Sequence, residues 1–571
     1  MPAGLRRSGS SGMRGEAGGG RPATAPGTAG PPAMARLRAY WLAPPGLAML
    51  AATLLALAIR LYTLTRPGYL TGVTEYDDGV YLGGAIRLLQ GSLPYHDFAF
   101  VQPPGILLLM APVAVLGKIG ATTHAMAAAR LLTVLASTAC VPLAGSLVRY
   151  RGVLVTLVTC GLLAIYPDDI ATAHTLILEP WLNLFCLLGV CIAFRRGRLA
   201  SSRRLVWAGV AIGFAGTVKY WAALPAVLLL AVCLLTGNGW AGRVRRAGTY
   251  TLGVIAGFAV PVLPFFAFAP AAFVHSTLFD QATRANSYVP VSLRLAHLTG
   301  LIDVLNGGGH FSLTAGVHSL LAGSGAAATS NTSVGWLPYA VALLGAGVLA
   351  IGYLWEPGRP SPLEWYVLAT AVATVAAVLG YSAFFYHYPA FAAPWLALSF
   401  GCAAGAVASG FRARPQVRRA LIGCCAVVVL AVAAFQVSEF RGLRATSVYP
   451  DRALIPAGSC VVSDQISLAI AANRFTAARP GCPDVLDGLA QTLVLSNGVS
   501  VQGGAASHPA VVAAWQSILS RADYVWLSPS NARRIPWTPE LTSWFAANFQ
   551  PLQVHGHPRG LGQVYQRIAG G

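Results

Sequence analysis

The sequence predicts an all-α polytopic membrane protein with about eleven transmembrane helices and a small α/β domain at its C-terminus. Hydrophobic residues make up 55% of the 571 residues and charged residues only 10%, whereas soluble domains usually carry about 25% charged residues. Apolar runs long enough to cross a bilayer recur between residues 41 and 437. Residues 438–571 instead contain strand-like pieces and an amphipathic stretch at 509–521, which indicates a soluble unit.

The apolar runs define the expected spans. We place them at residues 44–64, 126–148, 152–167, 178–194, 205–218, 220–236, 248–268, 334–355, 363–384, 388–410 and 418–437. The formal net charge is +20, and the arginines that produce it lie in short clusters between these runs. Clusters in such positions act as orientation signals on the cytoplasmic side. We therefore expect no nucleic-acid partner.

The arginine clusters determine which runs cross the membrane. Residues 1–40 are rich in Gly, Pro and Arg and predict a disordered basic cytoplasmic tail. We assume that the chain starts on the cytoplasmic side. All arginine clusters are then cytoplasmic under two conditions: residues 104–117 must stay at the outer interface, and residues 205–236 must cross the membrane twice, with a turn near Lys219. The non-cytoplasmic segments are then a first loop at 65–125, a short second loop near 168–177, a long loop at 269–333, and the domain at 438–571.

The nineteen acidic residues avoid the middle of the expected spans. An ion-coupled transporter usually needs carboxylates at mid-membrane depth, so this distribution argues against one. Most of the acidic residues instead fall in the outer loops and the C-terminal domain. The pattern favours a site at the outer boundary between water and lipid.

The first loop carries the densest group of polar side chains. Glu75, Asp77 and Asp78 place three carboxylates in four residues, so we expect at least one raised pKa unless a cation or a metal ion balances them. An ionised carboxylate among them can take a proton from a hydroxyl group. The alternative is a solvated helix start with Asp77 or Asp78 as its cap. Other site candidates in this loop are Tyr81, Tyr95, His96, Asp97 and Gln102.

The order of residues in the first loop is informative as a set: Asp77, Asp78, Tyr81, Ala85, Leu88, Leu89, Gly91, Pro94, Tyr95, Asp97, Pro103 and Pro104. This order resembles the first outer loop of the GT-C glycosyltransferases. It is most similar to the branch that contains protein O-mannosyltransferases and the lipid A aminoarabinose transferase. The resemblance implies that Asp77 or Asp78 is the catalytic base, and it leaves the choice between them open because the family's usual pair is Asp-Glu.

Three further positions follow the order of the same family. Glu179 takes the acidic position of the second loop, and the resemblance implies a catalytic role in which it orients the acidic cluster or the acceptor. Lys219 resembles the lysine at the outer end of the fifth span that faces the donor phosphate. His387, within Tyr-His-Tyr-Pro, resembles a stretch at the start of a late span. The resemblance implies phosphate-binding roles for Lys219, His387 and, in the long loop, Arg284. A snorkelling lysine and a structural interfacial histidine are the alternatives.

The resemblance implies transfer of a sugar, with inversion, from a polyprenyl-phosphate donor to an acceptor in the cell envelope. The partners are then the donor, the membrane lipid and an envelope glycan, lipid or protein, and the location is the plasma membrane. No cofactor is certain, and a divalent metal between Asp77 and Glu179 stays open. Frequent Ala, Gly and Arg suggest a GC-rich bacterial genome of the actinobacterial kind.

Two other classes of function remain compatible with the sequence. A lipid or sugar transporter would need polar residues deep in its spans. A non-catalytic protein of envelope assembly would use the same helical body as a scaffold and would tolerate neutralisation of the acidic loop.

Two of the ten cysteines lie in the soluble C-terminal part. Cys460 and Cys482 predict a disulfide if that part is extracytoplasmic, because disulfides persist in oxidising compartments. Most of the other cysteines fall within apolar runs, where a small buried thiol is expected.

Overall fold

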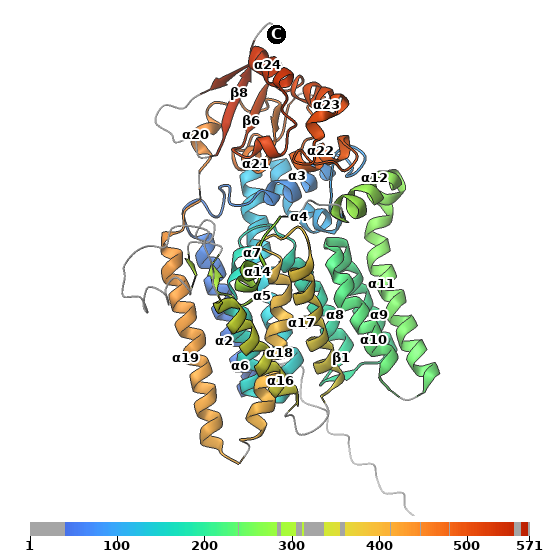
Figure 1. The fold of residues 1–571 in the computed structure, drawn as a ribbon, viewed down its shortest axis with the longest axis vertical. Coiled ribbons are helices and arrows are strands. Elements are labelled where there is room, and N and C mark those ends of the chain that lie inside the picture. The colour runs from blue at the N-terminus through green and yellow to red at the C-terminus, as the bar shows by residue number, and fades with distance from the viewer. Residues whose placement is uncertain are drawn as a thin grey trace, which may run out of the picture. The chain divides into compact units, whose positions relative to one another are not determined.

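In the computed structural model the chain divides into two units, Met1–Ala43 and Pro44–Gly571. The structure describes residues 40–237, 239–282, 287–303, 311–312, 336–354, 360–411, 413–445, 447–478, 480–552 and 561–568. Most of the expected N-terminal tail therefore lies outside the described residues. The second unit contains the helical bundle and a C-terminal α/β region (Figure 1).

Helices form at all eleven places where the sequence predicts spans. They are α2 (Pro44–Leu64), α5 (Thr122–Val148), α6 (Val153–Ile165), α8 (Glu179–Ala193), α9 (Ser202–Val218), α10 (Ala223–Leu235), α11 (Trp240–Phe268), α16 (Leu337–Leu354), α17 (Pro362–Gly380), α18 (Pro389–Ser409) and α19 (Pro415–Glu439). Among the described residues, seven helices are long and apolar enough to cross a membrane, or eight if one bent pair counts as a span. The helices α8, α9 and α10 have only 15, 17 and 13 residues, so length alone supports fewer spans than the sequence estimate.

Glycines bring α9 and α11 into close contact. Gly209 and Gly213 on α9, and Gly253 and Gly257 on α11, repeat at four-residue spacing. A Cβ atom on any of the four would collide with the backbone of the other helix. Small residues at this spacing allow membrane helices to approach closely and gain van der Waals contact. This packing supports the C-terminal end of α9, where Lys219 follows.

Two helices of the first loop stay at one end of the bundle. They are α3 (Asp77–Leu89) and α4 (Gly105–Ile119), which lie near each other beneath the C-terminal α/β region in Figure 1. Gly105 packs so closely against Thr217 of α9 that a side chain there would collide with it. The position of α4 agrees with the expectation that this segment does not cross the bundle. The chain also turns at Lys219, between α9 and the short helix η2 (Tyr220–Ala222), as expected.

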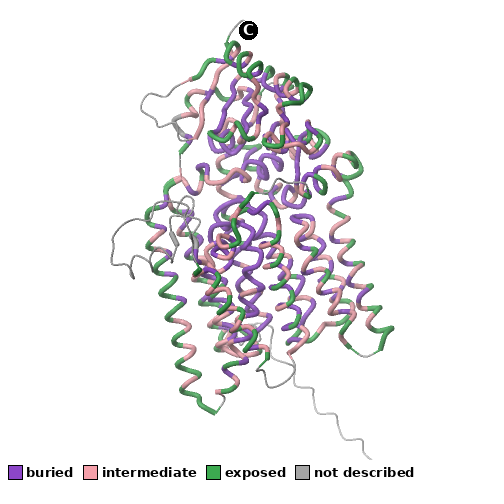
Figure 2. Tube along the Cα trace, viewed as in Figure 1, coloured by how far each residue is buried: buried purple, intermediate pink, exposed green. Residues whose placement is uncertain are grey.

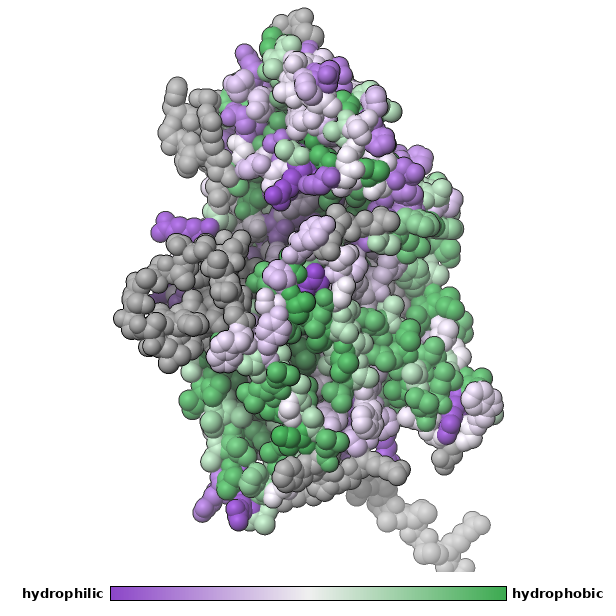
Figure 3. Space-filling view, viewed as in Figure 1, coloured by the Kyte–Doolittle hydropathy of each residue, from purple (hydrophilic) through white to green (hydrophobic). Residues whose placement is uncertain are grey.

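Arginine-rich segments lie at the other end of the bundle. They include η1 (Arg149–Arg151) and the hairpin of β1 (Phe194–Arg195) and β2 (Arg198–Leu199). Arg151 pairs with Glu364 at the start of α17, and the Leu363 N–H donates to the Gly197 carbonyl at 3.3 Å. Figure 3 shows apolar side chains over the visible face of the bundle between its two more polar ends. The acidic first loop and the arginine-rich hairpin are therefore separated along the bundle.

The second loop differs from its expected form. Residues Pro167–Ala173 form a helix, α7, bent by 56° from α6. Asp168 and Asp169 in its first turn are fully buried, although the sequence places them in a short non-cytoplasmic loop. Burial is possible because each carboxylate has a basic partner, as described below.

The long loop begins with a bent helical segment and ends before α16. Its described elements are α12 (Pro270–Val274), the π-helix η3 (His275–Phe279), α13 (Asp280–Ala282), α14 (Val291–Leu298), β3 (Ile302–Asp303) and β4 (Phe311–Ser312). Arg294 of α14 donates to the carbonyl oxygens of Val378, Leu379 and Tyr381 at 2.5–3.2 Å. This guanidinium satisfies carbonyl groups that the end of α17 leaves unpaired, and so holds α14 against the bundle.

A four-stranded sheet forms the centre of the C-terminal region. Its order is β5-β6-β8-β7, with β5 (Val461–Ser463) parallel to β6 (Tyr524–Leu527), and β8 (Gln563–Arg567) antiparallel to both β6 and β7 (Phe549–Leu552). The other elements are η4 (Phe440–Gly442), α20 (Tyr449–Arg452), α21 (Ser467–Ala471), α22 (Gly488–Leu495), η5 (Ala505–Ser507), α23 (Pro509–Leu519), η6 (Asn531–Arg533) and α24 (Pro539–Asn548). The helix α23 forms within the amphipathic stretch that the sequence predicts at 509–521.

The two faces of this sheet have different partners. Because side chains alternate along a strand, Val462 and Val525 pack in one apolar cluster with Trp515 of α23 and Phe545 of α24. Val461, Tyr524 and Trp526 belong to a second cluster, which also contains side chains of α3, α4 and α5. The C-terminal region and the first loop thus share one core, visible as continuous burial in Figure 2.

Gly79 marks the closest approach between α3 and the C-terminal region. A Cβ atom there would collide with the backbone of Ser467, which begins α21. Backbone atoms cannot rotate away as a flexible side chain can, so only glycine allows this contact.

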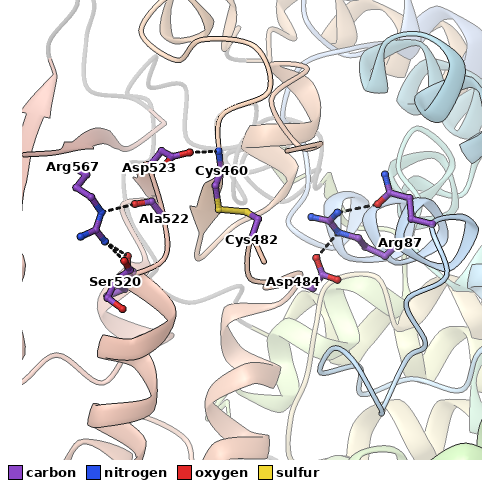
Figure 4. Close-up of a disulfide and its surroundings, with 10 residues drawn as sticks. Arg87, Cys460, Cys482, Asp484, Ser520, Ala522, Asp523 and Arg567 are labelled. Atoms are coloured by element: carbon purple, nitrogen blue, oxygen red, sulfur yellow. Dashed lines mark hydrogen bonds and ion pairs between the residues drawn. A yellow bond between two sulfur atoms is a disulfide. The ribbon is translucent and has the colours of Figure 1, made fainter. Parts of the chain in front are cut away.

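The C-terminal region also contains the expected disulfide. Cys460 and Cys482 are bonded, with their Cα atoms 5.5 Å apart. Figure 4 shows this bond beside the ion pair of Arg87 on α3 with Asp484, which follows Cys482 by two residues. The bond therefore links the start of β5 to a segment that contacts the first loop.

We predict that Gly79→Ala lowers the unfolding free energy by about 1–3 kcal/mol, because the methyl group overpacks a rigid backbone contact. Thermal unfolding of the purified protein measures the effect. The control is Gly248→Ala on α11, where a Cβ atom meets nothing within 4 Å. Equal melting temperatures for the two variants would contradict the packing argument.

Candidate active site

Asp78 is the structural member of the acidic pair. Its side chain is fully buried, and Arg130 of α5 donates to Oδ2 from Nε at 3.1 Å and from Nη2 at 2.5 Å. The backbone N–H of Leu176 donates to Oδ1 at 2.6 Å. Arg130 also donates to the Tyr69 carbonyl and the Thr74 hydroxyl. Asp78 is thus neutralised and fully hydrogen-bonded, which fastens the start of α3 to the bundle.

Asp77 and Glu75 lie on the more accessible side of the same turn. Both are partly exposed, and the Tyr81 hydroxyl lies 3.3 Å from Oδ2 of Asp77. The Tyr386 hydroxyl donates to Oε2 of Glu75 at 2.6 Å. Burial raises the pKa of the Glu75 carboxyl, the Tyr386 hydrogen bond offsets part of this rise, and the nearby charge of Asp78 adds to it.

Glu179, Lys219 and His387 form a second group. Glu179 begins α8 and is fully buried. Lys219 Nζ donates to its Oε1 at 2.5 Å, and His387 Nδ1 lies 2.9 Å from its Oε2. Lys219 Nζ also lies 4.1 Å from the ring centroid of Tyr388 and 5.0 Å from that of Trp221. The carboxylate and two aromatic faces therefore hold the lysine in a low-dielectric setting.

Three consecutive residues before α18 connect these two groups. Tyr386 contacts Glu75, His387 contacts Glu179, and the Tyr388 ring lies against Lys219. Residues 386–388 thus join the acidic turn of the first loop to the lysine and histidine group. The sequence predicted His387 as a site residue, but nothing in it indicated that its neighbours Tyr386 and Tyr388 bridge the two groups.

The buried carboxylates of α7 also have basic partners. Asp168 Oδ1 lies 3.2 Å from Nδ1 of His297 on α14. Asp169 pairs with Arg60 of α2, and the Ser137 hydroxyl donates to the same carboxylate at 3.0 Å. The sequence signal for such pairs is an arginine within an apolar helix, which usually marks a buried carboxylate partner. Arg60 and Arg130 both carry that signal.

The remaining candidates lie in different surroundings. Tyr95 is buried and donates to the Gln102 carbonyl at 2.5 Å, so both shape the loop before α4. His96 and Asp97 pair with each other at 2.7 Å in an exposed turn, where the N–H of Leu93 lowers the pKa of Asp97. None of the contacts described for these four residues involves Asp77. Arg284 lies outside the described residues.

A divalent metal between Asp77 and Glu179, which the resemblance leaves open, does not fit the donor atoms. Both oxygens of Glu179 already face the nitrogen atoms of Lys219 and His387. Among the described residues, no group of three or more His, Cys, Asp or Glu side chains is arranged to hold a metal ion. We therefore derive no step through a metal.

The fold has clear counterparts among solved structures. ArnT from Cupriavidus metallidurans in the apo state is 15% identical, with a TM-score of 0.52 over 91% of this chain and 98% of that chain. The same protein bound to undecaprenyl phosphate is 16% identical, with a TM-score of 0.53 over 92% and 98%. The Archaeoglobus fulgidus oligosaccharyltransferase is 12% identical, with a TM-score of 0.52 over 94% and 75%. No curated protein matches the sequence.

A family model matches part of the sequence directly. Residues 116–279 match the model of the dolichyl-phosphate-mannose-protein mannosyltransferase family. This segment runs from α4 to the π-helix of the long loop and includes Arg130, Glu179 and Lys219. The chain is thus similar in sequence to the protein mannosyltransferase family over this segment, and similar in fold to ArnT and to the archaeal oligosaccharyltransferase over most of its length. The expected fold class, a multi-pass helical GT-C body with a small C-terminal sheet region, is confirmed.

We predict that Asp78→Asn and Asp77→Asn differ in stability. Asp78→Asn leaves the buried Arg130 guanidinium without its counter-charge, which typically costs about 3–5 kcal/mol. Asp77→Asn removes a partly exposed charge and should change the unfolding free energy by less than about 0.5 kcal/mol. Thermal unfolding in detergent separates the two. Similar losses of unfolding free energy in both variants would contradict the buried ion pair assigned to Asp78 alone.

Proposed function

We propose that the chain transfers a sugar from a polyprenyl-phosphate donor to an acceptor hydroxyl outside the cytoplasm, with inversion at the anomeric carbon. The observation that supports this proposal best is the bridge made by residues 386–388 between the acidic turn and the lysine group. A base for the acceptor and a cation for the donor phosphate then lie on neighbouring parts of one site. An inverting transfer needs these two groups on opposite sides of the sugar carbon.

Asp77 is the proposed general base. Asp78 is buried and engaged by Arg130, whereas Asp77 is partly exposed in the same helical turn. A base must reach the acceptor hydroxyl within hydrogen-bond distance and must be able to accept its proton. Of the two carboxylates, only Asp77 is open to an approaching hydroxyl, and this difference in exposure supports Asp77 where the sequence left the choice open. Glu75, held by Tyr386, lies beside it as a second acidic group.

Lys219 and His387 are the proposed donor-phosphate contacts. Glu179 orients the Lys219 ammonium and the His387 ring nitrogen in a buried setting, where the lysine charge acts more strongly than in water. Fixed positive charge stabilises the phosphate as it leaves the anomeric carbon. The neighbouring folds support this class of donor, since one is ArnT bound to undecaprenyl phosphate and another is an archaeal oligosaccharyltransferase with a dolichol-phosphate. Arg284 remains a further proposed contact.

The proposed orientation puts the acidic turn and the C-terminal region outside the cytoplasm. The arginine-rich segments lie at the other end of the bundle (Figure 1), where the positive-inside tendency predicts cytoplasm. In this proposal residues 1–40 form a cytoplasmic tail, residues 41–437 the membrane body, and residues 438–571 an extracytoplasmic domain. The acceptor is then a glycan, lipid or protein of the envelope of a bacterium.

Asp77→Asn should lower sugar transfer about 10²–10⁴-fold, because the amide cannot accept the acceptor's proton. The assay uses purified full-length protein with a panel of radiolabelled polyprenyl-phosphate sugars, starting with mannose, and envelope fractions as acceptors. Near-full activity in this variant would remove Asp77 from the mechanism. Flipping or uptake of the labelled lipid in vesicles without acceptor would instead support a transporter.

Lys219→Gln should raise the KM for the donor about tenfold or more, since one hydrogen bond between charged groups contributes about 1.5–3 kcal/mol. Glutamine keeps a donor for Glu179 and removes the positive charge. Lys118 is the other lysine of the sequence, and its exposed side chain donates to the Leu89 carbonyl at 3.2 Å. Lys118→Gln is therefore the control, and an equal KM in both variants would argue against the phosphate contact.

A further inference from the structure

We propose that Asp487 and Arg534 of the C-terminal region are positioning residues for Asp77 and act through the side chain of Tyr76. The inference rests on the proposed function, in which Asp77 is the base. It assigns the C-terminal region a direct part in arranging the active site. Neither residue touches the reacting groups in this scheme.

Tyr76 is the point of contact between the two parts of the chain. It lies between Glu75 and Asp77 and precedes the first residue of α3. Its hydroxyl donates to Oδ1 of Asp487 at 2.7 Å. The guanidinium carbon of Arg534 lies 4.0 Å from the centroid of its ring. Both the hydroxyl and the ring face of Tyr76 are therefore held by residues more than 400 positions away in the sequence.

Asp487 is itself rigidly held. Its Oδ1 also accepts from the Ala490 N–H at 2.9 Å, as the N-cap of α22. Its backbone forms an isolated bridge with Gln465, just after β5. A fixed acceptor limits where the Tyr76 hydroxyl can lie.

Arg534 is anchored at the ends of two strands. Its Nη1 donates to Oδ2 of Asp464 at 2.8 Å and to the Ser528 hydroxyl at 3.0 Å. Asp464 follows β5 and Ser528 follows β6, and these strands are parallel, so both residues lie at the same edge of the sheet. Ser528 donates to the Asp464 carboxylate from its N–H and its hydroxyl, each at 2.6 Å. Because Arg534 is fixed to the sheet, the ring of Tyr76 that lies against it is held in a fixed position relative to the sheet.

The acidic turn is consequently clamped from two sides. The bundle holds Glu75 through Tyr386 and Asp78 through Arg130, and the C-terminal region holds Tyr76. Burial and the Asp487 charge raise the pKa of the Tyr76 phenol, so this group stays protonated and continues to donate. Asp77 lies within this clamped turn. Because misplacement of a reacting group by about 1 Å can cost about 10²-fold in rate, loss of one side of the clamp should slow transfer.

The other end of α3 offers a matched comparison. There the Ser92 hydroxyl donates to Oδ2 of Asp484 at 3.1 Å, and Arg87 pairs with the same carboxylate at 2.8 Å. The Ser92 bond is the same kind of contact as the Tyr76 bond: a hydroxyl of the first loop donating to a carboxylate of the C-terminal region. It lies after the last residue of α3, whereas Asp77 is the first.

The test compares Tyr76→Phe, Tyr76→Leu and Ser92→Ala in the full-length purified protein. Tyr76→Phe removes only the hydroxyl and keeps the ring beside Arg534, while Tyr76→Leu removes both contacts. Polyprenyl-phosphate-mannose is the donor probe, and kcat, donor KM and melting temperature are measured for each. We expect kcat to fall about tenfold in Tyr76→Phe and about a hundredfold in Tyr76→Leu. The donor KM should stay within about twofold in both Tyr76 variants, because donor binding does not depend on the position of the base. Ser92→Ala should keep the normal kcat, because the Ser92 contact lies at the other end of α3 from Asp77.

Three results would overturn the inference. Normal kcat in Tyr76→Leu would show that Asp77 needs no support from this side. A raised donor KM with unchanged kcat would place Tyr76 in donor binding. Equal losses in Tyr76→Phe and Ser92→Ala would show that the contacts only hold the two parts together.

Asp77→Asn, measured in the same assay, keeps the two proposals separate. Loss of transfer in Asp77→Asn with normal kcat in both Tyr76 variants would overturn only the positioning role. Retained transfer in Asp77→Asn would overturn the proposed base, whatever the Tyr76 variants show.

Discussion

Asp78 and Arg130 form an ion pair from which water is excluded, and the place of the acidic turn depends on it. An unpaired charge at this depth would be strongly destabilising, so α3 must keep its first turn against α5. The additional bonds from Arg130 to Tyr69 and Thr74 extend the constraint over the chain that leads into the turn. Everything proposed for Asp77 assumes this anchor, because Asp77 is the adjacent residue.

The first loop packs between the helical bundle and the C-terminal region and contacts both. Its apolar side chains share a core with α5 and with the inner face of the C-terminal sheet. Gly79 allows the backbone of Ser467 to approach α3, and the Arg87–Asp484 pair closes the other end of the helix. Changes in the C-terminal region can therefore reach the acidic turn both through this shared core and through the polar contacts at the two ends of α3.

The sequence contained enough information for the membrane body and for part of the site. Apolar run length located the helices, and the chain does turn at Lys219, between α9 and η2, where the arginine clusters predicted a turn. The buried state of Asp168 and Asp169 was missed, because their partners His297 and Arg60 lie on α14 and α2, far away in sequence. Asp487 and Arg534 carried no local signal at all, since only the docked sheet brings them to Tyr76.

Helix geometry explains why a pair of acidic residues suits this position. Successive side chains on an α-helix point about 100° apart, so two adjacent carboxylates at its start point in different directions. Asp78 points into the bundle toward Arg130, and Asp77 is left at the partly exposed side near Tyr81. Asp78 is engaged in an ion pair with Arg130, and this pair holds the adjacent Asp77 in place. The same pairing compensates the buried charge of Asp78 without any contribution from Asp77.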